Sequence, residues 1–89
     1  MTASILIVED EEPIQILLTY NLQAEGFRVR ATANGEDTAH LVNEERPDLI
    51  LLDWMLPGIS GIEVCRLLRS RPETRDIPVI MLTARGEEN

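Results

Sequence analysis

Residues 47–58 read PDLILLDWMLPG and are informative about the fold. Four consecutive apolar residues, Leu49 to Leu52, stand between Asp48 and Asp53, and a Pro-Gly pair closes the stretch. A short continuous apolar run is typical of a strand buried on both faces, as in a parallel sheet. The stretch therefore predicts a central parallel strand that ends at an acidic residue.

Three other segments are expected to be strands of the same sheet. Residues 5–8 and 79–82 are continuous apolar runs, which predict two more buried strands. Residues 27–32 alternate apolar and polar side chains, which favours an edge strand with one solvated side.

Helical periodicity fills the gaps between these strands. A first helix is expected from Pro13 to a stop at Gly26, and a second over residues 36–45. A third is expected to begin with the capping-box pattern Ser60-Gly61-Ile62-Glu63 and to end before Pro72. The apolar stripe of the first helix would comprise Ile14, Leu17, Leu18 and Leu22, and the third would bury Ile62, Cys65 and Leu68.

Strands and helices alternate along all 89 residues, which predicts one α/β domain with a parallel sheet and right-handed crossovers. The net charge of −8 makes direct contact with nucleic acid or anionic lipid unfavourable. A single cysteine excludes an internal disulfide, and neither a signal peptide nor a membrane span is expected. These features favour a soluble, cytoplasmic protein.

Acidic residues follow two of the expected buried strands. Glu9 and Asp10 end the first, and Asp53 ends the third. Carboxyl ends of neighbouring strands line the ligand crevice of an open parallel sheet, so three carboxylates meet if these two strands are adjacent. Their repulsion requires a cation, and oxygen ligands of this kind suit Mg²⁺. Thr83, after the fourth strand, would face the same crevice. If each acid only capped the helix that follows it, there would be no reason for all four groups to converge.

Three motifs together resemble the receiver domain of two-component response regulators: ILIVEDE at 5–11, PDLILLDWMLPG at 47–58 followed by Gly61, and PVIMLTA at 78–84. The resemblance covers the whole chain, so residues 1–89 are expected to form one receiver domain. Within the family, DWMLPG and RDIPV are similar to winged-helix transcription factors that control phosphate regulons. The implied fold is a flavodoxin-like parallel sheet with strand order 2-1-3-4 over the four strands present.

The resemblance also implies roles for individual residues. Asp53 would be the phosphoacceptor, taking a phosphoryl group from a sensor histidine kinase. Glu9, Asp10, Asp53 and the main-chain carbonyl of Met55 would hold Mg²⁺. Thr83 would be the switch hydroxyl that bonds a phosphoryl oxygen. Signalling of this kind is phosphotransfer and autodephosphorylation, so no separate enzymatic activity is expected.

The chain departs from the family pattern at its C-terminal end. It contains no lysine, whereas a family receiver has one at the end of a fifth strand. The fifth βα unit is expected to be missing, together with a DNA-binding domain downstream. Contact with DNA would then occur only through that missing domain, and a homodimer or higher oligomer is expected.

Two other functions compete with the phosphoacceptor. Hydrolases that form an aspartyl phosphate need a second acid two residues after the nucleophile, where this chain has Met55. A pseudo-receiver that acts only as an interaction module is suggested by the missing lysine, although the three retained acids argue against it. A dinucleotide-binding fold is excluded because no G-x-G-x-x-G motif follows the first strand.

Overall fold

The computed structural model describes residues 2–82 of the chain. Within this part, secondary structure follows the order β1 (Ser4–Val8), α1 (Glu12–Ala24), β2 (Arg28–Thr32), a 3-10 turn η1 (Gly35–Asp37), α2 (Thr38–Glu44), β3 (Leu49–Asp53), α3 (Gly61–Arg69) and β4 (Val79–Leu82). The four strands and three helices expected from the sequence are all present. No helix of the described part has the length and apolar character needed to cross a bilayer.

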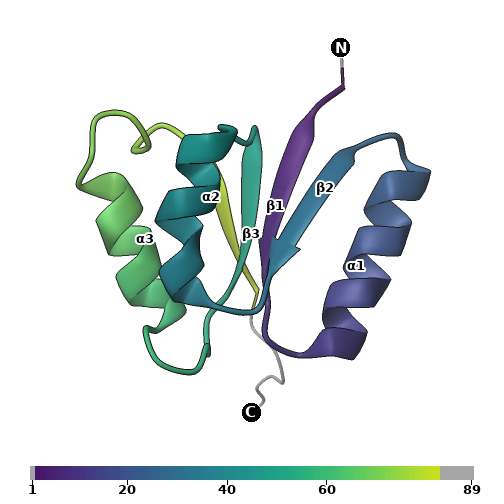
Figure 1. The fold of residues 1–89 in the computed structure, drawn as a ribbon, viewed down its shortest axis with the longest axis horizontal. Helices are drawn as coiled ribbons and strands as arrows, with labels where there is room; N and C mark the ends of the chain where they lie inside the picture. The colour runs from purple at the N-terminus through teal and green to yellow at the C-terminus, as the bar shows by residue number, and fades with distance from the viewer. Residues whose placement is uncertain (1, 83–89) are drawn as a thin grey trace.

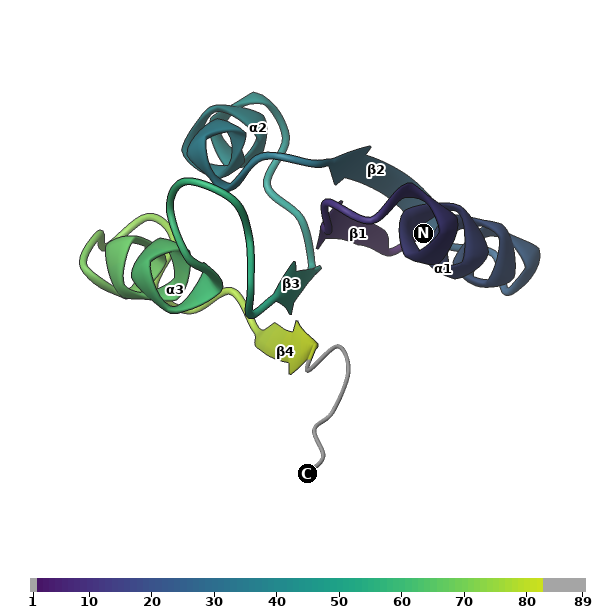
Figure 2. The ribbon, with the colours of Figure 1, turned by 90° about the horizontal axis from the view of Figure 1, so that it is seen from below.

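The four strands form one parallel sheet in the order β2-β1-β3-β4. Helix α1 lies on one side of the sheet, and α2 and α3 lie on the other (Figure 1). Figure 2, a view turned by 90°, shows the three layers along the strands. The predicted fold class and strand order are therefore confirmed for the described residues, and β2 is an edge strand as its alternating pattern indicated.

The core has two parts because successive side chains of a strand point to opposite faces of the sheet. Between the sheet and helices α2 and α3 lies the larger cluster, whose buried members are Leu6, Val8, Val42, Ile50, Leu52, Leu56, Val64, Leu68 and Ile77. Ile5, Ile7 and Leu51 form the smaller cluster against α1. Central strands covered on both faces need apolar residues at every position, which explains their continuous apolar runs.

The local signals at two helix ends are confirmed by the geometry. The Ser60 hydroxyl accepts a hydrogen bond of 3.2 Å from the Glu63 backbone N–H, as in a capping box. Gly26 follows α1 with a φ of +97°, a conformation that other residues adopt only at a cost. The second helix differs from its predicted start, because Gly35–Asp37 forms a 3-10 turn and regular α-helix begins only at Thr38.

The expected buried faces of α1 and α3 were partly wrong. Leu17 is 61% exposed and Ile62 is 47% exposed, whereas Val64 is buried. Val64 and Leu68 are four residues apart and share the face of α3 that meets the sheet. Ile62 precedes Val64 by two residues and so points away from that face. Cys65 is half-buried beside the larger cluster.

Candidate metal centre at the carboxyl edge of the sheet

Three carboxylates converge where strands β1 and β3 end. Glu9 and Asp10 directly follow β1, and Asp53 is the last residue of β3. The two strands are adjacent and parallel, with Val8 beside Leu52, so their carboxyl ends meet at one edge. One oxygen from each of the three carboxylates lies within 4.8 Å of the other two.

Burial makes this arrangement electrostatically unfavourable without a cation. Glu9 is 1% exposed and Asp53 is 2% exposed, whereas Asp10 is open to solvent. Burial raises the pKa of Glu9 and of Asp53 above their ordinary values, and repulsion from neighbouring carboxylates adds to the rise. Hydrogen bonds from backbone N–H groups oppose the rise in both pKa values. A hard divalent cation fits this set of oxygen donors, because it stabilises the ionised form of each carboxylate.

Backbone and side-chain hydrogen bonds hold the two buried carboxylates in place. The Glu11 N–H donates to the Glu9 carboxylate over 3.0 Å, and the Met55 N–H donates to Asp53 Oδ1 over 3.1 Å. From helix α1, Gln15 Nε2 donates to the main-chain carbonyl of Glu9 over 2.9 Å. The role of Gln15 was not predicted from the sequence. Its only signal there was its position in the first turns of the helix that follows the acids.

The loop from β3 to α3 is shaped by two glycines. Gly58 has a φ of +75°, a conformation that glycine adopts without a steric cost, in the turn after Asp53. Gly61 allows a close approach, since a Cβ at this position would lie 2.2 Å from the main-chain oxygen of Asp53. The Gly61 N–H also donates to the Trp54 carbonyl over 3.1 Å. The start of α3 is thereby tied to the end of β3.

A hydrogen bond from a separate segment also fixes this loop. The Glu36 carboxylate accepts a hydrogen bond of 3.3 Å from the Ile59 N–H. Glu36 belongs to η1, so the contact joins two connections that are far apart in the sequence. No local pattern marked Glu36, because the pairing depends on how the two loops meet in space.

The remaining predicted site residues lie around the three carboxylates or outside the described part. Met55 is two residues after Asp53 and is 60% exposed. Trp54 directly follows Asp53 and is 46% exposed. Thr83, the predicted switch hydroxyl, lies outside the described residues.

Comparison with known proteins agrees with this architecture. Residues 5–89 match the family described as the response regulator receiver domain. This chain belongs to that family.

The most similar curated relatives include phosphate regulon transcriptional regulatory proteins. The receiver domain is 57% identical over 89 residues to PhoB of Rhizobium meliloti (strain 1021), covering 100% of this chain and 39% of the relative. It is 50% identical over 88 residues to PhoB of Escherichia coli (strain K12), covering 99% of this chain and 38% of the relative. The chain thus spans less than half of the length of these relatives.

Solved structures show the same fold. The N-terminal domain of a response regulator receiver protein from Methanoculleus marisnigri JR1 superposes with a TM-score of 0.89 at 36% identity, covering 96% of this chain and 69% of that one. The receiver domain of sensor histidine kinase PA1611 from Pseudomonas aeruginosa PAO1 gives 0.88 at 33% identity, covering 94% and 69%. That structure has a magnesium ion coordinated in its active-site cleft.

Proposed function

We propose that residues 1–89 form a phosphoacceptor receiver domain in which Asp53 accepts a phosphoryl group from a sensor histidine kinase. The observation that carries the proposal is the convergence of Glu9, Asp10 and Asp53 within 4.8 Å. Two of these carboxylates are buried, a costly arrangement that a purely structural role does not explain. Membership of the receiver family supports the same function.

In the proposed reaction a carboxylate oxygen of Asp53 attacks the phosphorus of a phosphohistidine. The P–N bond breaks, and its electron pair stays on the imidazole of the kinase. The Met55 N–H, 3.1 Å from Asp53 Oδ1, orients the carboxylate for this attack. Gly61 and Glu36 fix the loop beside the reacting group, so the chain supplies positioning more than acid–base chemistry.

Glu9, Asp10, Asp53 and the main-chain carbonyl of Met55 would hold Mg²⁺ in this proposal. The bound ion would neutralise charge on the phosphoryl oxygens. The oxygen-only donor set and the raised pKa values of Glu9 and Asp53 support the assignment. Thr83 is proposed as the switch hydroxyl that bonds the phosphoryl group after transfer.

The partners follow from the same proposal. Helix α1, which begins two residues after Asp10, exposes Ile16, Leu17 and Tyr20, and this apolar surface supports docking of a kinase. The cytoplasm is the proposed location of this exchange. The relatives include transcriptional regulators, and this chain covers 39% of the length of the one from Rhizobium meliloti. Both facts support a DNA-binding output domain outside these residues. Phosphorylation would act on that domain through a homodimer.

The test combines metal binding with phosphorylation. Mg²⁺ is titrated while Trp54 fluorescence is followed, and phosphoryl incorporation from acetyl phosphate is measured by intact mass. We expect Asp53→Ala to abolish phosphorylation and to lower the Mg²⁺ affinity sharply. Glu73→Gln, an exposed charge change remote from the acids in sequence, is the matched control.

The outcomes also distinguish a phosphoacceptor from the main alternative, a pseudo-receiver. A chain that binds no Mg²⁺ and stays unlabelled would be a pseudo-receiver acting only as an interaction module. Slow labelling is expected even for a true phosphoacceptor, because these residues contain no lysine to pair with the phosphoryl group. For Thr83→Ala, labelling should persist while the output of the intact regulator is lost.

A further inference from the structure

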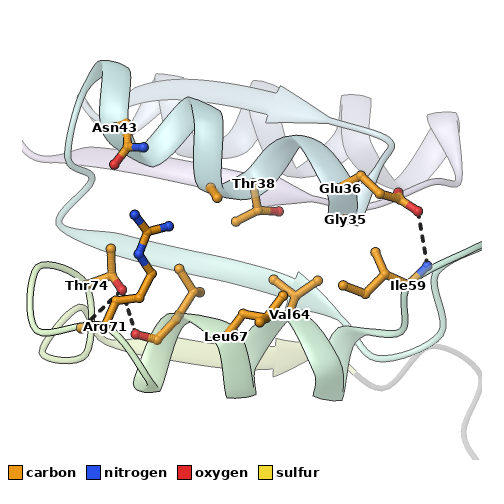
Figure 3. Close-up of a pocket in the computed structure, with 11 residues that line it drawn as sticks. Gly35, Glu36, Thr38, Asn43, Ile59, Val64, Leu67, Arg71 and Thr74 are labelled. Carbon is orange, nitrogen blue, oxygen red and sulfur yellow. Dashed lines mark hydrogen bonds between the residues drawn. The ribbon is translucent and has the colours of Figure 1, made fainter.

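A pocket lies between helices α2 and α3, on the side of the sheet that carries the larger core cluster. Its volume is about 130 Å³, and its walls come from η1, α2, α3 and the connection to β4. Figure 3 shows the lining side chains between the two helices. Ile59, Val64, Leu67 and Leu68 make the walls largely apolar. A cavity of about 150 Å³ with such walls accommodates a benzene-sized group.

One polar group inside this pocket has no partner. Thr38 is 1% exposed, and its Oγ1 has no hydrogen bond in the described structure. The side chain of Thr38 lies in the space between α2 and α3 (Figure 3). Thr74, a second threonine of the lining, instead donates to the Leu68 carbonyl over 2.6 Å. A buried hydroxyl without a partner is unfavourable, and a ligand group that reached Thr38 Oγ1 would remove this cost.

The pocket lining contains one base, Arg71, and one acid, Glu36, whose carboxylate already accepts a hydrogen bond from the Ile59 N–H. Residues 66–75 contain four arginines and one glutamate. Within residues 2–82, Arg66 pairs with Glu63 and Arg69 donates to main-chain carbonyls. The guanidinium of Arg71 has no such contact in the same range, and its side chain extends from the end of α3 toward α2 (Figure 3). An unpaired guanidinium at the rim favours a carboxylate.

We propose that this pocket binds a small aromatic carboxylate. The ring would lie against Val64, Leu67 and Leu68, which matches the volume and apolar walls. A hydroxyl on the ring would donate to Thr38 Oγ1, and the carboxylate would pair with Arg71. The proposed contacts do not involve the convergent acids at the strand ends, although Glu36 and Ile59, whose hydrogen bond fixes the loop after β3, also line the pocket.

The test uses the protein that carries these residues, expressed from its own gene, with 4-hydroxybenzoate as the probe. Methyl chemical shifts of Val64, Leu67 and Leu68 are followed during the titration, and Leu18 and Leu22 on the opposite face of the sheet serve as internal controls. A ligand of this size is expected to bind with a Kd on the order of 1 mM. Shifts confined to the α2–α3 side are the expected result.

Two variants and one analogue examine the polar contacts. Arg71→Gln and the neutral analogue 4-hydroxybenzamide should each weaken binding about tenfold, since both remove the ion pair. Thr38→Val should weaken binding about threefold and leave the melting temperature equal or higher, because the hydroxyl it removes is unpaired. Arg71 is exposed, so its variant should fold normally.

Several results would each overturn the proposal. These are the absence of shifts up to about 20 mM probe, an affinity unchanged by Arg71→Gln, and shifts centred on the α1 side of the sheet. A lower melting temperature for Thr38→Val would also contradict it, by showing that the hydroxyl has a partner within the protein.

Discussion

At the scale of single residues, adjacent acids in the sequence occupy opposite environments. Glu9 is buried, and Asp10, its neighbour, is exposed. Both residues follow β1, whose residues are all buried, so burial ends between Glu9 and Asp10. A buried carboxylate costs free energy when ionised, and this cost is the physical basis for the expected dependence on cations.

The pKa of Glu9 predicts a specific pH dependence for the metal-free protein. Burial raises this pKa in the folded state above its ordinary value of 4.5. Just above that pH, the folded protein then holds more protons than the unfolded chain. The contribution of Glu9 to stability therefore falls as the pH rises from the ordinary pKa toward the raised pKa. In EDTA at pH 7, Glu9→Gln should be more stable than the wild type by on the order of 1 kcal/mol.

Thermal or urea unfolding at several pH values measures this difference. The stability advantage of Glu9→Gln should shrink as the pH approaches 4, and saturating Mg²⁺ should reverse it. Glu73→Gln removes the same charge from an exposed position and should show neither effect. An advantage that is constant with pH would rule out the titration of Glu9 as its cause.

At the scale of elements, the start of α3 is packed directly on the end of β3. Gly61 makes this possible, because the main-chain oxygen of Asp53 occupies the space where a Cβ would lie. The first residue of a helix and the last residue of a strand thus form one rigid corner next to the proposed phosphoacceptor. A change at Gly61 should consequently affect both stability and the site.

Gly61→Ala tests this corner. Its Cβ would meet the Asp53 oxygen at 2.2 Å, so the backbone must shift. We expect a loss of about 1–3 kcal/mol in unfolding free energy, together with weaker Mg²⁺ binding because Asp53 moves. Urea unfolding and Mg²⁺ titration measure the two effects.

Gly26→Ala provides the matched control. Gly26 has a φ of +97° and open space around the position of a Cβ. Alanine there should cost about 1–2 kcal/mol through backbone conformation alone. The Mg²⁺ affinity of this variant should be unchanged, and a loss similar to that of Gly61→Ala would refute the local explanation.

At the scale of the whole molecule, stability is concentrated in the sheet and the two clusters that flank it. Leu52 is fully buried in the larger cluster, whereas Leu17 is 61% exposed on α1. The two leucines belong to apolar patterns that look equally favourable in the sequence. Their contributions to folding should nevertheless differ strongly.

Alanine at these two positions measures the difference. Leu52→Ala should lower the unfolding free energy by about 2–5 kcal/mol, because it removes buried methyl groups and leaves a cavity. Leu17→Ala should change it by less than about 0.5 kcal/mol. Comparable losses in urea unfolding would show that the exposed face of α1 is covered in solution.

The sequence alone was sufficient for the strands, the three helices and the acidic residues at the strand ends. These features depend on local periodicity and on the chemistry of neighbouring residues, which act over a few positions. The capping box at Ser60 and the left-handed conformation of Gly26 are local in the same sense. The motifs of the receiver family could also be identified from the sequence alone.

Other features depended on which segments meet in space. The exposure of Leu17 and Ile62, the contact from Glu36 to Ile59 and the unpaired hydroxyl of Thr38 were absent from the local pattern. Each results from the angle and depth at which a helix packs against the sheet or a neighbouring helix. Periodicity defines the apolar side of a helix only broadly, and long-range packing selects the residues on that side that lose contact with water.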